Sequence, residues 1–142
     1  MATTNASASP RRLQRLRYSK KCGGRNTCNN IAGNKRGIVM RFVLVRTDRP
    51  GMAERRAKLQ PAHITYQQPF LPMIKFGGGL VEDGVDTSAD VDIRNVVGNV
   101  LVFEAPNREV VEKFHANDPY TLEDMFEFAI IKPLWQRVPA LD

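Results

Sequence analysis

The sequence predicts an α+β domain in which four strands and two helical regions follow one another in the order β, α, β, β, α, β. Three observations support this fold class. Apolar runs typical of strands begin near residues 37, 74, 98 and 125. Segments with helical composition or spacing lie between the first and second runs and between the third and fourth. A turn-rich segment without such spacing joins the second run to the third.

The first strand is expected over residues 37–47, because the turn sequence Asp48-Arg49-Pro50-Gly51 follows it. Residues 52–59 are rich in Ala, Glu, Lys and Arg and indicate a short helix. Pro61 is expected to interrupt this helix and to open a second one, which places His63 in its first turns.

Two further prolines, Pro69 and Pro72, are expected to end or kink that second helix early. The next strand is predicted over residues 74–81. Its three consecutive glycines, residues 77–79, indicate a bulge or a close approach of backbones beside a cleft. No helix follows these glycines, so they do not match a phosphate-binding or dinucleotide-binding loop.

The second half repeats the strand and helix pattern. After an acidic loop over residues 84–95, a strand is predicted over residues 98–104. A helix is expected over residues 107–116, with Asn107 as its N-cap. A brief helical turn then precedes the last strand, residues 125–132, which Pro133 ends.

Two helical regions on one face of a four-stranded antiparallel sheet give a ferredoxin-like βαββαβ fold. That fold leaves the other face of the sheet bare, yet the strands carry apolar residues at both alternating positions. Two sheets packed face to face would bury this surface, so we predict a homodimer. The aromatic residues expected to be able to face the partner are Phe42, Phe126 and Phe128.

The positive net charge of +6 belongs to the N-terminus. Residues 1–39 contain nine basic residues and no acidic residue, which leaves 12 basic and 15 acidic residues in the rest of the chain. Residues 1–37 are expected to form a basic, disordered extension, because they contain few large apolar residues, and residues 38–142 to form the domain. Apart from Tyr18, the extension has no aromatic residues interleaved for base stacking, so nucleic acid is not expected as a partner.

The N-terminal extension leaves two questions of origin open. Its acid-free composition fits a mitochondrial transit peptide, and translation from Met40 instead of Met1 is the alternative. No apolar run is long enough for a transmembrane helix, so we expect a cytoplasmic protein unless the extension is a transit peptide. Cys22 and Cys28 cannot complete a four-ligand zinc site, and neither a metal nor a cofactor is expected.

His63 and Asp118 are the candidate catalytic residues. An aspartate that accepts a hydrogen bond from one imidazole nitrogen fixes the tautomer and leaves the other nitrogen free for proton transfer. Asp118 also has a plainer interpretation, because Asn-Asp-Pro is a helix-ending turn in which the carboxylate bonds backbone amides. Tyr120 is the candidate substrate-binding residue, with core packing as its alternative, and His115 is expected to face solvent or a dimer interface.

Several segments, taken in order, resemble the YCII-related family over residues 40 to 136. They are residues 40–46, Arg55-Arg56 through Pro61-Ala62-His63, the glycine-rich strand with Asp83-Gly84, Asn117-Asp118-Pro119-Tyr120, and Ile131-Lys132-Pro133-Leu134. The resemblance implies a dimeric α+β barrel with His63 and Asp118 as the active-site dyad. At least one lineage of the family is associated with the dehydrochlorination of a chlorinated hydroxyhydroquinone, while most members have no assigned reaction. Pro69, Pro72 and the loop over residues 84–95 depart from the family pattern.

Two classes of function follow from these residues. The first is a cofactor-independent lyase or isomerase, in which His63 and Asp118 transfer a proton on a cyclic or hydroxylated aromatic substrate. The second is a binding module that holds a small molecule in the same dimeric cleft without chemistry. Turnover in addition to binding would distinguish the enzyme from the module.

Overall fold

The computed structural model describes residues 37–139. The N-terminal extension, with Cys22 and Cys28, lies outside the described residues except for Gly37. Its disorder and its role as a transit peptide therefore stay predictions. The first strand begins at Met40, so Ile38 and Val39 precede the strand that they were expected to join.

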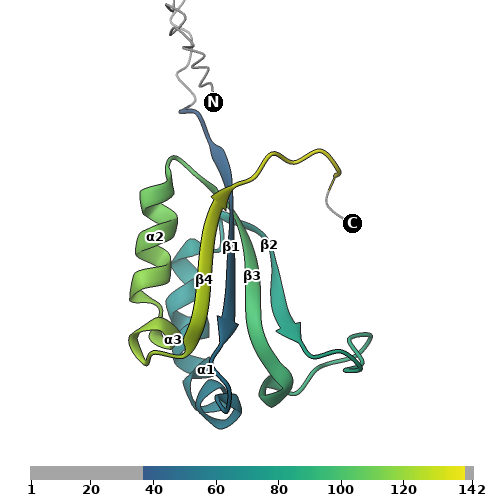
Figure 1. Cartoon of the computed structure of the whole chain (residues 1–142). Coiled ribbons are helices and arrows are strands. Elements are labelled where there is room, and N and C mark those ends of the chain that lie inside the picture. The colour runs from purple at the N-terminus through teal and green to yellow at the C-terminus, as the bar shows by residue number, and fades with distance from the viewer. Residues whose placement is uncertain (1–36, 140–142) are drawn as a thin grey trace, which may run out of the picture. The chain divides into compact units, whose positions relative to one another are not determined.

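The described elements confirm the α+β, ferredoxin-like fold. In chain order they are β1 (Met40–Asp48), α1 (Ala53–Gln67), η1 (Gln68–Phe70), β2 (Ile74–Val81), η2 (Ile93–Asn95), β3 (Val96–Ala105), α2 (Arg108–Asn117), α3 (Pro119–Leu122) and β4 (Phe126–Pro133). The strands form one antiparallel sheet in the order β2-β3-β1-β4. The α-helices cover one face of this sheet (Figure 1).

Helix α1 corrects the prediction of two helices separated at Pro61, because it continues through this proline. Pro61 lacks the N–H that a helix interior uses, but tertiary packing on both sides of it offsets that loss. Arg56 and His63 are seven residues apart, so they lie on the same side of α1, and both are buried. His63 consequently lies in the second half of one long helix. As predicted, Pro69 stops the α-helix, in the short 3₁₀ turn η1.

The hydrophobic core lies between the sheet and the helices. In β1, Phe42 and Leu44 point toward this core and are buried, while Val43 and Val45 alternate with them and are half-buried. Phe114 on α2 is fully buried and meets the Phe103 ring of β3, with ring centres 4.9 Å apart. Asn107 caps α2 as predicted, accepting a hydrogen bond from the backbone N–H of Val110.

The dimerisation prediction needs a correction for two of its three aromatic residues. Phe42 and Phe126 are buried on the helix side of the sheet, whereas Phe128 is 52% exposed. Strand β4 has a bulge here: Asp48 pairs with Phe126 and Thr47 with Phe128, so β4 has an extra residue opposite β1. The bulge changes the alternation, so Phe126 and Phe128 point to opposite faces although they are two residues apart.

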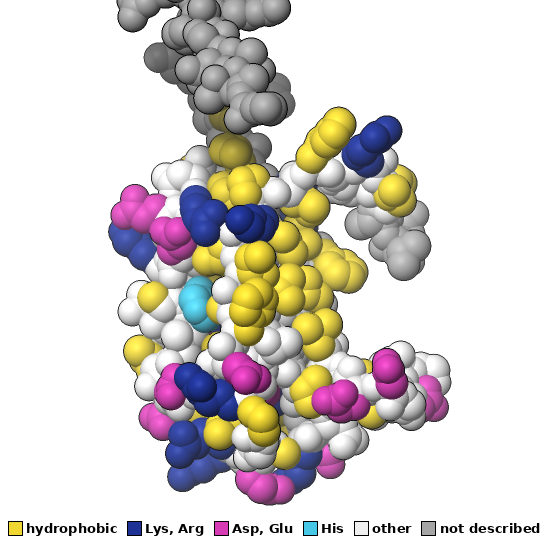
Figure 2. All heavy atoms as spheres, viewed as in Figure 1, with side chains coloured by type: hydrophobic (Ala, Val, Ile, Leu, Met, Phe, Trp, Pro, Cys, Tyr) yellow, Lys and Arg dark blue, Asp and Glu magenta, His cyan; other side chains and the backbone are white. Residues whose placement is uncertain are grey.

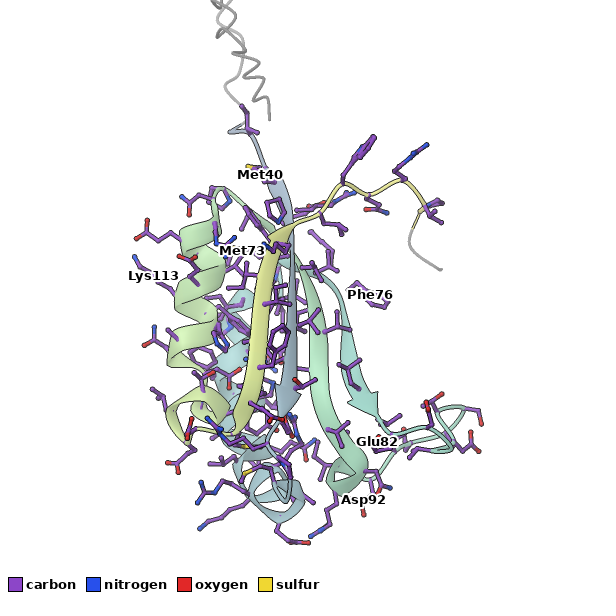
Figure 3. The ribbon with its side chains drawn as sticks, viewed as in Figure 1. Met40, Met73, Phe76, Glu82, Asp92 and Lys113 are labelled. Atoms are coloured by element: carbon purple, nitrogen blue, oxygen red, sulfur yellow. The ribbon has the colours of Figure 1, made fainter. Side chains whose placement is uncertain are left out.

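The sheet face opposite the helices, which we term the outer sheet face, is largely apolar. Figure 2 shows hydrophobic side chains gathered over the strands, and Figure 3 shows Phe76 of β2 pointing away from the helices. The strand register places these apolar side chains on the outer sheet face: Val43, Val45, Phe76, Leu80, Val100, Val102, Phe128 and Ile130. Among the described residues, no helix covers these side chains. None of the described helices is long and apolar enough to cross a membrane.

Candidate active site

The structure brings His63 and Asp118 together, although 55 positions separate them. His63 comes from α1, and Asp118 lies between α2 and α3. His63 Nδ1 is 3.0 Å from Asp118 Oδ1, and both side chains are buried. Because a carboxylate only accepts hydrogen bonds, this contact assigns the proton to Nδ1 and leaves Nε2 of a neutral imidazole as an acceptor.

Asp118 is held at both oxygens. Oδ1 accepts a second hydrogen bond from the backbone N–H of Tyr120 at 3.0 Å, and Oδ2 accepts one from Arg46 Nη1 at 2.8 Å. Burial alone would raise the pKa of Asp118, but the hydrogen bond with His63 and the charge of Arg46 outweigh it and hold the pKa below its usual value. The carboxylate therefore caps α3 and orients His63 at the same time.

Arg46 and Asn99 are site residues that the sequence reasoning missed. Arg46 is fully buried, and its Nε donates a hydrogen bond to Asn99 Oδ1 at 2.8 Å. Its guanidinium lies over the Phe126 ring, 4.5 Å from the centre. The pattern did contain a signal: in β1 and in β3, a polar side chain continues the alternation that buries the large apolar residues.

Tyr120 lies against the imidazole. Its ring stacks on that of His63 with centres 4.4 Å apart and an angle of 22° between the planes. The guanidinium of Arg56 lies 4.6 Å from the centre of the Tyr120 ring, and Arg56 itself is paired with Asp48. Burial raises the pKa of Tyr120, so its phenol stays protonated near neutral pH. Tyr120 thus packs in the core, and its contact with a substrate stays a prediction.

A cleft of about 300 Å³ lies between α1 and the helix-facing side of β2 and β3. His63, Tyr120 and Asn99 line it, together with the glycines at positions 77–79. A Cβ at Gly77 would overlap the side chain of Leu101, which explains the glycine at that position. The glycines pair in register with β3, and the register shifts lie on either side of them, between Ile74 and Phe76 and between Leu80 and Val81. The predicted bulge therefore does not fall within the glycine run, and the close approach at Gly77 is to a side chain.

His115, the second histidine, is separate from this arrangement. It is half-buried at the end of α2, with its ring 6.0 Å from that of Phe126. Burial lowers its pKa, and the charge of Arg46 acts in the same direction. Among the described residues, no hydrogen bond joins it to Asp118. Residues 37–139 also contain no group of three or more potential metal-ligating side chains, and the expectation of no metal site stays a prediction.

A larger groove of about 620 Å³ lies elsewhere on the domain. Phe76 and Val102 line it together with the C-terminal segment 134–139, in which Trp135 is 82% exposed. The groove contains no histidine and does not include His63 or Asp118. Acid–base chemistry is therefore better supported in the smaller cleft.

Comparison with known proteins agrees with the resemblance. The model of the YCII-related domain matches residues 40–135. The chain belongs to the YCII-related family. No curated protein matches its sequence.

Solved structures similar to this YCII-related protein include a complex of 5-chloro-2-hydroxyhydroquinone dehydrochlorinase (TftG) from Burkholderia phenoliruptrix AC1100 with 2,5-dihydroxybenzoquinone. That structure is 30% identical, with a TM-score of 0.62, and the match covers 70% of this chain and 96% of that one. A NIPSNAP family protein from Agrobacterium tumefaciens is 14% identical with a TM-score of 0.44, over 70% of this chain and 94% of that one.

Proposed function

We propose that this protein is a cofactor-independent enzyme that transfers a proton on a hydroxylated aromatic or cyclic substrate. The single observation that carries the proposal is the hydrogen bond between His63 Nδ1 and Asp118 Oδ1 at the wall of a cleft. A titratable residue at a cleft with a specific charged partner is a candidate for a functional site, and His63 with Asp118 is such a pair. The similarity to a dehydrochlorinase supports elimination as the reaction class.

In the proposed reaction, Nε2 of His63 removes a proton from a hydroxyl group or carbon of the bound ring. Asp118 keeps the proton on Nδ1 and stabilises the imidazolium that forms. The imidazolium then returns the proton to a ring carbon, which converts the enol into its keto tautomer. Where that carbon bears a leaving group such as chloride, loss of a second hydroxyl proton to His63 drives the electron pair through the ring, breaks the carbon–chlorine bond and leaves a quinone and chloride. Proton return alone is the isomerisation, and proton return followed by chloride loss is the elimination.

We further propose that the protein acts as a homodimer joined through the outer sheet face. The support is the apolar surface around Val45, Val100 and Phe128, which the described helices leave uncovered. Apolar patches of this kind usually mark an interaction surface. One face of strand β2 lines the cleft, and its opposite face belongs to the outer sheet face. A partner bound there would therefore also stabilise the wall of the cleft.

The enzyme proposal predicts both binding and turnover. Titration with 2,5-dihydroxybenzoquinone should change the intrinsic fluorescence of the purified protein in a saturable way. With the protein present, 5-chloro-2-hydroxyhydroquinone should release chloride faster than it does in buffer alone. General acid–base catalysis typically contributes about 10²–10⁴-fold. Chloride release should be measured with an ion-selective electrode under anaerobic conditions, because quinols oxidise in air. Saturable binding with no release from this or other halogenated hydroquinones would favour the non-catalytic binding module.

A further inference from the structure

A buried arginine holds the far side of the candidate dyad. Arg46 lies on the core side of β1, where Phe42 and Leu44 are its neighbours at alternating positions. An aliphatic side chain would suit this position without any desolvation cost, and replacing a buried ion pair by apolar residues is often neutral or stabilising. Stability therefore gives no sufficient reason for a charged residue here.

The hydrogen bonds of Arg46 are divided between two elements. Nε is bonded to Asn99 on β3, and Nη1 to Asp118 Oδ2 at the start of α3. The planar guanidinium fixes the angle between these two bonds, which a lysine with one nitrogen cannot reproduce. Since Arg46 occupies Oδ2, the other oxygen of Asp118 is left to His63 and to the Tyr120 N–H.

The charge of Arg46 has a second consequence for the imidazole. An unbalanced aspartate next to a histidine favours the imidazolium, which cannot accept a proton. With Arg46 at 2.8 Å, the carboxylate and guanidinium together carry no net charge. Other titratable groups around the pair are the Arg56–Asp48 ion pair beyond Tyr120, the phenol of Tyr66 on α1, and His115 on α2. None of these contacts Asp118 through a side-chain hydrogen bond among residues 37–139.

We infer that Arg46 is a positioning residue of the dyad: it fixes Asp118 through Oδ2 and balances its charge, so that Oδ1 holds Nδ1 of His63 and Nε2 points away from the carboxylate. This inference rests on the proposed function, because it assigns Arg46 a part in the same proton transfer. Asn99 supports it by holding the guanidinium from the cleft side. Arg46 itself does not line the cleft and is not expected to contact the substrate.

The test is an NMR titration of the imidazole nitrogens in the full-length, ¹⁵N-labelled protein. The chain has two histidines, so the spectrum is simple, and a His115→Gln variant assigns it. In the wild type, His63 should carry its proton on Nδ1. In Arg46→Met, the titration midpoint of His63 should rise by about one to three pH units, because Asp118 is no longer balanced. Arg46→Lys keeps the charge, so its His63 midpoint should lie close to that of the wild type.

A matched control separates this effect from loss of packing. Leu44→Ala removes a fully buried side chain from the same face of β1 without changing any charge, and should leave the His63 midpoint in place. An unchanged midpoint in Arg46→Met, or an equal shift in Leu44→Ala, would overturn the inference. If chloride release is absent in the wild type while the midpoint shifts as expected, the proposed function fails and the positioning role of Arg46 stands.

A measurement on the unsubstituted protein covers the case in which Arg46→Met does not fold. The Nε–H of Arg46 is buried and bonded to Asn99, so it should exchange slowly with water. Its resonance should also move as His63 titrates, because Asp118 links the two groups. An Arg46 Nε–H that exchanges rapidly with water would contradict the positioning role. So would a chemical shift of this group that stays constant while His63 titrates.

Discussion

Replacing His63 with alanine should lower kcat by about 10²–10⁴-fold, the usual contribution of a general acid or base. The side chain sits at the cleft wall and forms little of the core, so the variant should fold. Asp118→Asn should keep substrate binding and lose kcat, because the amide can donate to Nδ1 and hold the wrong tautomer. Steady-state chloride release from 5-chloro-2-hydroxyhydroquinone measures both effects.

The second histidine provides the control for this prediction. His115→Gln alters a half-buried imidazole that has no hydrogen bond to Asp118 among the described residues, and should retain wild-type kcat. Circular dichroism and thermal unfolding should be recorded for every variant, because Asp118→Asn leaves the buried charge of Arg46 unbalanced. Wild-type kcat in both His63→Ala and Asp118→Asn would exclude the dyad as the proton-transfer pair.

Phe128→Glu should convert the proposed dimer to a monomer. It places a charge on the outer sheet face, on the edge strand β4, where a carboxylate without a partner would be costly to bury in the proposed interface. Activity should fall with the oligomeric state, because β2 loses the support of the partner behind the cleft. Sedimentation velocity at micromolar concentrations, with chloride release at the same concentrations, measures the two together.

Leu122→Glu is the matched control for the interface. Leu122 is 69% exposed, like Phe128 a large apolar side chain on the surface, but it lies on α3 on the opposite side of the sheet. This variant should sediment as the wild type does. A wild-type protein that sediments as a stable monomer would contradict the dimer, and so would a Phe128→Glu variant that remains dimeric.

Much of the fold could be predicted because its signals are local. Strand β2 has the predicted limits, and Asn107 caps α2, since glycine runs, turn residues and capping residues act within a few positions. Pro61 was different. A proline signals a break in any sequence, yet α1 continues through Pro61, with the buried residues Arg56 and His63 on either side of it. Tertiary contacts override a local preference there.

The two faces of the sheet show a second limit. Alternation indicated apolar side chains on both faces but placed Phe126 and Phe128 on the same one. The bulge between them depends on how β4 pairs with β1, and no residue in β4 indicates it from the sequence alone. A register shift of one position exchanges the buried and exposed side chains.

The site was predicted in part for a related reason. The motifs around His63 and Asp118 are compact and could be recognised from the sequence. Arg46 and Asn99 lie within two largely apolar strands, and neither residue is next in the sequence to His63 or Asp118. Their relation to Asp118 depends on the pairing of β1 with β3 and on the position of α3 above the sheet. Such contacts become visible only when the elements are assembled.

The location of a bound ligand tests the central claim most directly. A crystal structure of this protein with 2,5-dihydroxybenzoquinone should show the ring in the cleft between α1 and β2, with one of its oxygens about 2.6–3.2 Å from Nε2 of His63. Nδ1 of the same imidazole should remain bonded to Asp118. A ligand that occupies the groove beside Trp135, with the His63 cleft empty, would contradict the proposed active site.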